Sequence, residues 1–220
     1  MTVPNEQTAN RVERRKQRTR AALIKAAQTF IAEGRLNVPV LDITQAADVG
    51  MGSFYNHFSS KDELFDAAVT DVLDAHGALL DALTAPIDDP AETFACSFRL
   101  TGRLFRRRPQ ESQIILNNGL ALISSERGVA PRARRDLSAA IKAGRFTIAD
   151  PDLALTIAGG VLIGAGVLIR DRPDRDDGVI ADQVTQELLR LFGLPDREAH
   201  EICSKPLPDL DSLSKPDSAA

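Results

Sequence analysis

The chain has 220 residues, of which 43% are hydrophobic and 26% charged, as in soluble globular proteins of one or two domains. Its two cysteines, Cys96 and Cys203, are too few for a disulfide framework and show no metal-ligand spacing. We therefore expect a reduced, cytoplasmic protein without a metal or other cofactor. No apolar run marks the N-terminus, so we expect no signal peptide.

Charge is distributed unevenly along the chain. Residues 1–61 carry nine Lys and Arg against five Asp and Glu, whereas residues 62–220 carry 18 against 26. A basic head on an acidic body is typical of a protein whose N-terminal part binds nucleic acid phosphates. A chance fluctuation of a few charges is the alternative.

The first predicted elements are three helices. Residues 1–10 are polar and expected to fray, but from Arg11 onward the apolar residues recur at spacings of three and four, up to Phe30 and Ile31. Gly34 is a plausible stop. A second short helix is expected after Pro39 and a third ending near Phe58.

Capping signals predict the helices that follow. Ser60 and Glu63 have the spacing of a capping box, which opens a helix expected to end near Leu83. Further starts are predicted where an acid precedes proline, at Asp89 and Asp150, and at two other prolines, Pro109 and Pro131. Gly144 and Gly193 follow periodic runs and are expected to end helices in left-handed conformations. Since no stretch alternates with period two, the fold class is predicted as all-α, with nine or ten helices.

One segment resembles a membrane span. From Leu153 to Ile169 only Thr156 is polar, but 17 residues are fewer than the ~20 that a spanning helix needs. The run also holds four glycines and ends in Arg170. We expect a helix buried by protein, with no membrane partner.

Residues 40–64 carry the most specific pattern in the chain. Small residues between two short helices allow a close, steep crossing, while Gly50 and Gly52 keep the start of the second helix free of bulk. Phe54 and Phe58, four residues apart, anchor that helix to a core and leave its polar residues facing elsewhere. This geometry favours a helix-turn-helix motif.

The same string resembles the TetR family of transcriptional regulators. The positions that match the family pattern are Ile43, Ala47, Val49, Gly52, Phe54, Tyr55, His57, Phe58, Ser60, Lys61, Glu63, Leu64 and Phe65. The resemblance implies an N-terminal three-helix helix-turn-helix DNA-binding domain over residues 1–60. A larger helical ligand-binding and dimerisation domain would follow over 61–205, and residues 206–220 are expected to form a disordered tail.

The resemblance also implies DNA-binding residues. Thr44 would hold phosphate from the first helix of the motif, and Tyr55, His57 and Lys61 would contact further phosphates. The groove-facing residues of the recognition helix would be Gly50, Met51, Gly52 and Ser53, with Asn56 among its polar groups. The basic run between Arg11 and Arg20 would approach the DNA backbone or minor groove, unless it is only a solvated face.

Two positions depart from the family pattern. Asp48 stands where the family usually has Gly, and we expect it to cap the recognition helix. Gly50 stands where Ser is usual, which puts a phosphate contact at this position in doubt.

In the family the last two long helices form a homodimer interface. Here the resemblance implies interface roles for Gly160 and Gly164 on the first of these helices and for Val184 and Leu188 on the second. A two-fold dimer would place its recognition helices about 34 Å apart, or a multiple of that, and would bind a palindromic operator in double-stranded DNA.

The body of the family binds a small-molecule effector, expected here to be apolar or amphipathic. Phe94 and Phe98 share a helical stripe that suits a pocket or a plain core, and Asn117 and Asn118 lie among aliphatic residues, where buried amides need partners. These four are the candidate ligand residues. A second stripe on the same helix, which contains Arg99, Arg103 and Arg106, is expected to be a solvated face.

The sequence thus predicts a ligand-responsive transcriptional regulator, most simply a steric repressor, although activation is not distinguishable from repression. The alternative is a helical dimer that binds a lipid or protein partner without DNA. An enzyme is not expected, because the histidines and cysteines form no catalytic or metal-binding motif.

Overall fold

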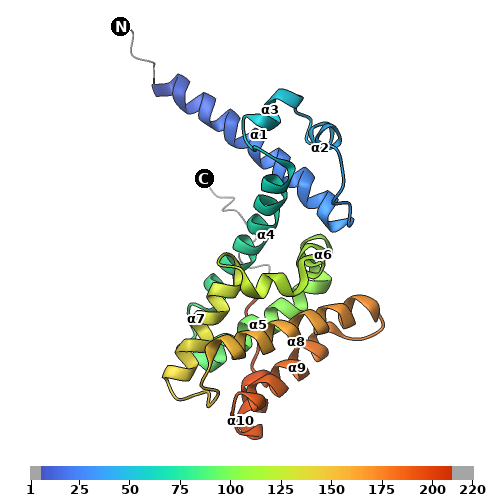
Figure 1. The fold of residues 1–220 in the computed structure, drawn as a ribbon. Helices are drawn as coiled ribbons and strands as arrows, with labels where there is room; N and C mark the ends of the chain where they lie inside the picture. The colour runs from blue at the N-terminus through green and yellow to red at the C-terminus, as the bar shows by residue number, and fades with distance from the viewer. Residues whose placement is uncertain (1–5, 210–220) are drawn as a thin grey trace. The chain divides into compact units, whose positions relative to one another are not determined.

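The computed structural model describes residues 6–209, with side chains for residues 11–119 and 121–209. Within this part of the chain there are ten α-helices, one 3₁₀ helix and no strand, which confirms the all-α prediction (Figure 1). The elements are α1 (Glu6–Ala32), α2 (Val40–Ala46), α3 (Met51–Tyr55), α4 (Lys61–Thr84), α5 (Pro90–Arg107), α6 (Pro109–Asn118), the 3₁₀ helix η1 (Gly119–Ser124), α7 (Val129–Lys142), α8 (Pro151–Asp171), α9 (Asp177–Leu191) and α10 (Asp196–Ser204). Most of the tail expected over 206–220 lies outside the described residues.

The chain forms two compact units, which meet inside α4 between Asp71 and Val72. The sequence predicts this boundary between residues 60 and 61. The first turns of α4 belong to the N-terminal unit because α1 holds them: the Gln28 amide donates to the Asp71 carboxylate at 2.9 Å and to the Ala68 carbonyl at 3.4 Å.

The N-terminal unit is built on the apolar face of α1. The spacing that predicted this helix places Leu23, Ala27 and Ile31 in the core. The helix ends as expected, because Gly34 adopts φ +70°.

In the C-terminal unit α5 is central and contacts α6, α7, α8, α9 and α10. Its start confirms the predicted capping chemistry: the Asp89 carboxylate accepts from the Ala91 N–H, ahead of Pro90. Asp150 caps α8 in the same way, accepting from two backbone N–H groups. The predicted left-handed residues at Gly144 and Gly193 are also confirmed, with φ of +70° and +106°.

The capping box at the start of α4 forms with one difference. The Ser60 hydroxyl accepts from the Glu63 N–H at 3.1 Å, as predicted. The Glu63 carboxylate reaches back one residue further than expected, to the N–H of Ser59 at 2.7 Å and to its hydroxyl.

The arginine stripe of α5 is not solvated, and that prediction was wrong. Arg99 is buried and donates to the Asp182 carboxylate of α9 at 2.7 Å, and Arg103 donates to both oxygens of the same carboxylate at 2.8 Å. Arg106 instead donates to carbonyls at the end of α8, including that of Ile169 at 3.1 Å. The stripe therefore joins α5 to α8 and α9.

Among the described residues one helix, α8, is long and apolar enough to cross a membrane by length and composition. Only 33% of its most apolar window is buried within the chain. Most of its other residues are half-buried or exposed.

Candidate DNA-binding surface and effector cavity

The helix-turn-helix is formed by α2, a turn and α3. Phe54 and Phe58 are fully buried, and their rings lie 6.2 Å apart. They anchor α3 to the core of the N-terminal unit, as their four-residue spacing predicted. The turn is closed by the Val49 N–H, which donates to the Thr44 carbonyl at 3.0 Å.

The turn before α3 corrects one prediction. The N-cap of α3 is Gly50, which makes no side-chain cap, so Asp48 does not cap the helix. Asp48 instead has φ +53° and is the one described non-glycine residue with positive φ. Left-handed backbone explains why glycine suits this position, and Asp tolerates it better than most residues because its short side chain bonds locally.

Most predicted DNA-contacting residues lie on the open side of α3. Met51, Gly52, Tyr55 and Asn56 are exposed, with Tyr55 62% exposed, and Ser53 is half-buried. A Cβ atom added at either Gly50 or Gly52 would meet nothing within 4 Å. The chain's own packing therefore does not require these two glycines, and the space in front of them is free for a ligand.

Thr44 drops out of this predicted set. It is only 1% exposed, and its hydroxyl donates to the Leu41 carbonyl at 2.9 Å. A threonine hydroxyl has one hydrogen to donate, so this group serves the helix and does not face an outside phosphate.

Positive charge gathers beside the motif. Burial, followed by the charges of Lys16 and Arg20, lowers the pKa of His57 below its usual value. The Arg20 guanidinium also lies 5.1 Å from the centre of the Phe58 ring, and the Lys61 ammonium 5.9 Å from that of Phe65. Of the basic run on α1, Lys16 and Arg20 are therefore the members that share a site with His57.

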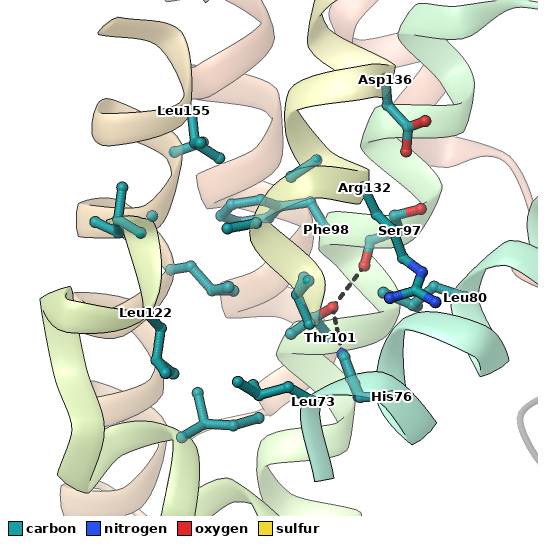
Figure 2. A pocket seen from close by; sticks show the side chains of 18 of the residues that line it. Leu73, His76, Leu80, Ser97, Phe98, Thr101, Leu122, Arg132, Asp136 and Leu155 are labelled. Atoms are coloured by element: carbon teal, nitrogen blue, oxygen red, sulfur yellow. Dashed lines mark hydrogen bonds between the residues drawn. The ribbon is translucent and has the colours of Figure 1, made fainter. Parts of the chain in front are cut away.

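The C-terminal unit contains a partly open cavity of about 110 Å³ (Figure 2). Phe94 and Phe98 contribute to its wall as predicted, whereas Asn117 and Asn118 do not. The Asn117 amide oxygen accepts from Gln113 at 2.8 Å, and the Asn118 amide donates to the Ile114 carbonyl of its own helix. The two amides are thus engaged locally along α6, so their predicted ligand contacts are not supported.

Sequence reasoning missed the polar groups of this wall. They come from three helices, α4, α5 and α7, and comprise His76, Asp81, Ser97, Thr101, Arg132 and Asp136. In Figure 2 most of these residues lie to one side of Leu122 and Leu155, which belong to the apolar wall. The capping and spacing rules act within one helix, so they do not indicate which side chains of three helices meet.

The charged residues of the wall form a network of ion pairs with one another and with Arg135. Arg132 donates to Asp81 at 2.8 Å and to the Gly128 carbonyl at 2.7 Å, while Arg135 bridges Asp81 and Asp136. Burial raises the pKa of Asp81, but the hydrogen bonds from Arg135 and Arg132 outweigh it and leave this pKa below its usual value. Burial raises the pKa of Asp136, and Arg135 offsets only part of that.

A second polar grouping centres on His76, which is 3% exposed. Its Nε2 lies 3.0 Å from the Thr101 hydroxyl, which itself donates to the Ser97 carbonyl at 2.8 Å (Figure 2). Burial lowers the pKa of His76 to about 4, and the charge of Arg108 acts in the same direction. The imidazole is therefore neutral at physiological pH.

The predicted dimer residues divide into two kinds. A Cβ atom at Gly160 or Gly164 would meet nothing within 4 Å, so both face open space along α8. Leu188, in contrast, is buried in the chain's own core, and Val184 packs partly against that core. The predicted interface role of Leu188 is corrected on this ground, whereas the exposed Val179 and Leu191 give α9 its outward apolar side chains.

Comparison with known families gives two matches that together span most of the chain. Residues 23–68 match the family described as bacterial regulatory proteins, tetR family. Residues 89–205 match the tetracyclin repressor-like C-terminal domain.

Individual proteins are also similar. The crystal structure of RolR in complex with its ligand resorcinol shares 35% identity over 90% of this chain and 98% of its own, with a TM-score of 0.64. RolR without ligand has a TM-score of 0.68 at 37% identity, over 86% of this chain and 99% of its own. The transcriptional repressor KstR2 of Mycolicibacterium smegmatis is 32% identical over 84 residues, which are 36% of this chain and 41% of that protein.

Proposed function

Because the chain belongs to the TetR family of bacterial regulators, we propose that it is a ligand-responsive repressor that binds a palindromic operator as a homodimer. The observation that carries the proposal is the geometry of α3. Two buried phenylalanines, Phe54 and Phe58, anchor one side of the helix to the core. The opposite side is exposed, and Gly50 and Gly52 leave the start of the helix free of side chains. A major groove admits such a helix.

The exposed groups divide by chemistry into two roles. Tyr55, His57 and Lys61 would bind phosphates, with Lys16 and Arg20 adding positive charge beside them. Met51 and Ser53, at the start of α3, would face the base edges, and Asn56 would add a polar contact. Gly50 and Gly52 would let the backbone approach the DNA closely.

The uncovered face of α8 supports the proposed dimer. Leu153 is about half exposed, and the bare positions Gly160 and Gly164 continue the same helical stripe. A second copy packed on this stripe and on the exposed apolar residues of α9 would bury it, and glycines permit close helix contact. The two-fold symmetry of such a dimer would match a palindromic operator.

The cavity is the site proposed for the effector. Its apolar wall favours a small, largely apolar molecule, and an apolar cavity of about 150 Å³ in another protein holds benzene. Since RolR binds resorcinol, a single-ring hydroxylated aromatic compound is the effector class that we propose here. Such a ligand releases the operator only if it binds more tightly to the dimer form that does not fit DNA.

The proposed cellular setting is the cytoplasm, where the DNA is. The alternative, a helical dimer that binds a lipid or protein without DNA, would leave the bare start of α3 without a purpose. A regulator of this kind needs no catalytic centre.

Capture of fragmented genomic DNA from the source organism by the purified protein, followed by sequencing, tests the proposal. A palindromic site should be enriched, and the enrichment should be lost in a His57→Ala variant that remains folded. Adding resorcinol should release the captured site if the proposed effector class is right. Absence of enrichment at moderate salt, from a folded dimer, would favour the alternative.

A further inference from the structure

We propose that His76 selects the effector by accepting a hydrogen bond from its hydroxyl group. This inference rests on the effector cavity of the proposed function and assigns the ligand's hydroxyl group a hydrogen-bond acceptor in the cavity wall. It begins with the direction of the hydrogen bonds around the imidazole.

The hydroxyl of Thr101 fixes that direction. It donates to the Ser97 carbonyl at 2.8 Å, so its hydrogen is already engaged. At 3.0 Å from Nε2 of His76 it must therefore act as acceptor, and Nε2 carries the ring hydrogen. A neutral imidazole has one N–H, so Nδ1 of His76 has a free lone pair.

Nδ1 has no hydrogen-bond partner among the described residues, since the one bond of this ring is that of Nε2. No side-chain nitrogen or oxygen that is sealed from solvent lacks a partner in this part of the chain. An unpartnered Nδ1 must therefore reach open space, and the space that His76 lines is the cavity. The cavity wall thus offers an acceptor to a ligand.

The ligand class follows from this acceptor and its surroundings. A hydrogen-bond donor is required, and a hydroxyl is an uncharged donor that a largely apolar cavity can hold once its hydrogen bond is made. A charged ligand is disfavoured, because both carboxylates of the wall already have cationic partners: Asp81 pairs with Arg132 at 2.8 Å and Asp136 with Arg135 at 2.9 Å. His76 therefore suits an uncharged ring with a hydroxyl group.

Phenol and toluene test this assignment because they differ only in a hydroxyl and a methyl of similar size. Calorimetric titration of the wild-type chain should show phenol binding about three- to tenfold more tightly than toluene, the gain from one hydrogen bond. An apolar cavity without an acceptor would prefer toluene. In His76→Phe the preference for phenol should vanish or reverse, while toluene binding persists.

Two further variants complete the experiment. His200→Phe makes the same change at an exposed histidine of α10 and should leave the preference intact. His76→Gln keeps a planar donor and acceptor and should retain part of the preference, which provides the test if His76→Phe does not fold. A phenol preference that survives in His76→Phe, or a wild-type chain that prefers toluene or binds neither compound, overturns the assignment.

Operator binding in the absence of ligand separates this inference from the proposed function. A protein that captures no DNA but prefers phenol through His76 refutes only the repressor function. A protein that captures a palindromic site and ignores the hydroxyl refutes only the role of His76.

Discussion

Arg99 and Asp182 form the most deeply buried ion pair between α5 and α9, with the guanidinium Nε 2.7 Å from the carboxylate and the two side chains 6% and 32% exposed. Arg99 also donates to the carbonyls of Ile202 and Lys205, at the end of α10. One guanidinium thus joins three helices of the C-terminal unit. Burial raises the pKa of Asp182, but hydrogen bonds from Arg103 and Arg99 outweigh it and keep the carboxylate ionised.

Removing this carboxylate should destabilise the protein strongly. Asp182→Ala leaves a buried guanidinium without its counterion, and we expect the free energy of unfolding to fall by about 3 kcal/mol, measured by urea denaturation. Asp174→Ala breaks an exposed pair with Arg172 and should change stability by less than about 0.5 kcal/mol. Equal effects of the two variants would contradict the central role of this pair.

The contrast between Asp182 and the helix caps shows what the sequence could predict. Caps such as Asp89 and Asp150 act on N–H groups within three residues, so local spacing identified them. Arg99 meets a partner 83 residues away, and nothing within α5 distinguishes a solvated stripe from a buried one. The same limit hid the cavity wall, in which His76 of α4 meets Thr101 of α5.

The recognition motif was predictable to a greater depth because its pattern is contiguous. Phe54 and Phe58 lie where their spacing placed them. One error concerns backbone conformation: Asp48 is predicted to cap α3, but it occupies the left-handed turn before that helix. A side chain's identity indicates what it can bond to and does not by itself give the φ angle of its backbone.

Replacing Asp48 should separate the effect of its left-handed backbone on stability from the effect of its negative charge on DNA binding. Asp48→Gly relieves the backbone at φ +53° and should raise the free energy of unfolding by up to about 1 kcal/mol. It also removes a negative charge beside the proposed DNA surface, so we expect operator affinity to increase about threefold at low salt. Fluorescence anisotropy with labelled operator and thermal unfolding measure the two effects.

Asp48→Asn is the matched control, because Asn tolerates left-handed backbone but has no charge. It should increase DNA affinity as much as glycine does and leave stability unchanged. An unaltered affinity in both variants would place the carboxylate away from the DNA.

The proposed phosphate contacts predict a particular salt dependence. Lys61→Ala should weaken binding to all DNA sequences and lower the slope of log K against log salt by about one. Tyr55→Phe loses a neutral hydrogen bond and should weaken binding about three- to tenfold with the slope unchanged. Lys142→Ala, on α7, serves as control. A loss confined to particular sequences in either variant would show that these side chains read bases.

The uncovered face of α8 predicts a monomeric variant. A Cβ atom at Gly164 would meet no other atom of the chain within 4 Å. Gly164→Arg should therefore leave the fold intact but place a charge in the proposed interface. We expect a monomer in sedimentation and the loss of palindromic operator binding. Ala143→Arg, an exposed change at the end of α7, should stay dimeric. A Gly164→Arg protein that remains dimeric would exclude this face as the interface.

His57, which lies near Lys16 and Arg20, predicts a pH-dependent operator affinity. In the free protein, burial and the charges of Lys16 and Arg20 hold the pKa of His57 below 6.5. A DNA phosphate at this site favours the protonated ring and raises that pKa, so binding takes up a proton. Affinity should therefore increase as pH falls from about 8 to 6, and the increase should stop below the pKa of the free protein, where both states are protonated. A pKa rise of one unit gives at most about a tenfold gain. In His57→Gln the affinity should not change over this range at constant salt, and a persisting pH dependence would assign the proton to another group.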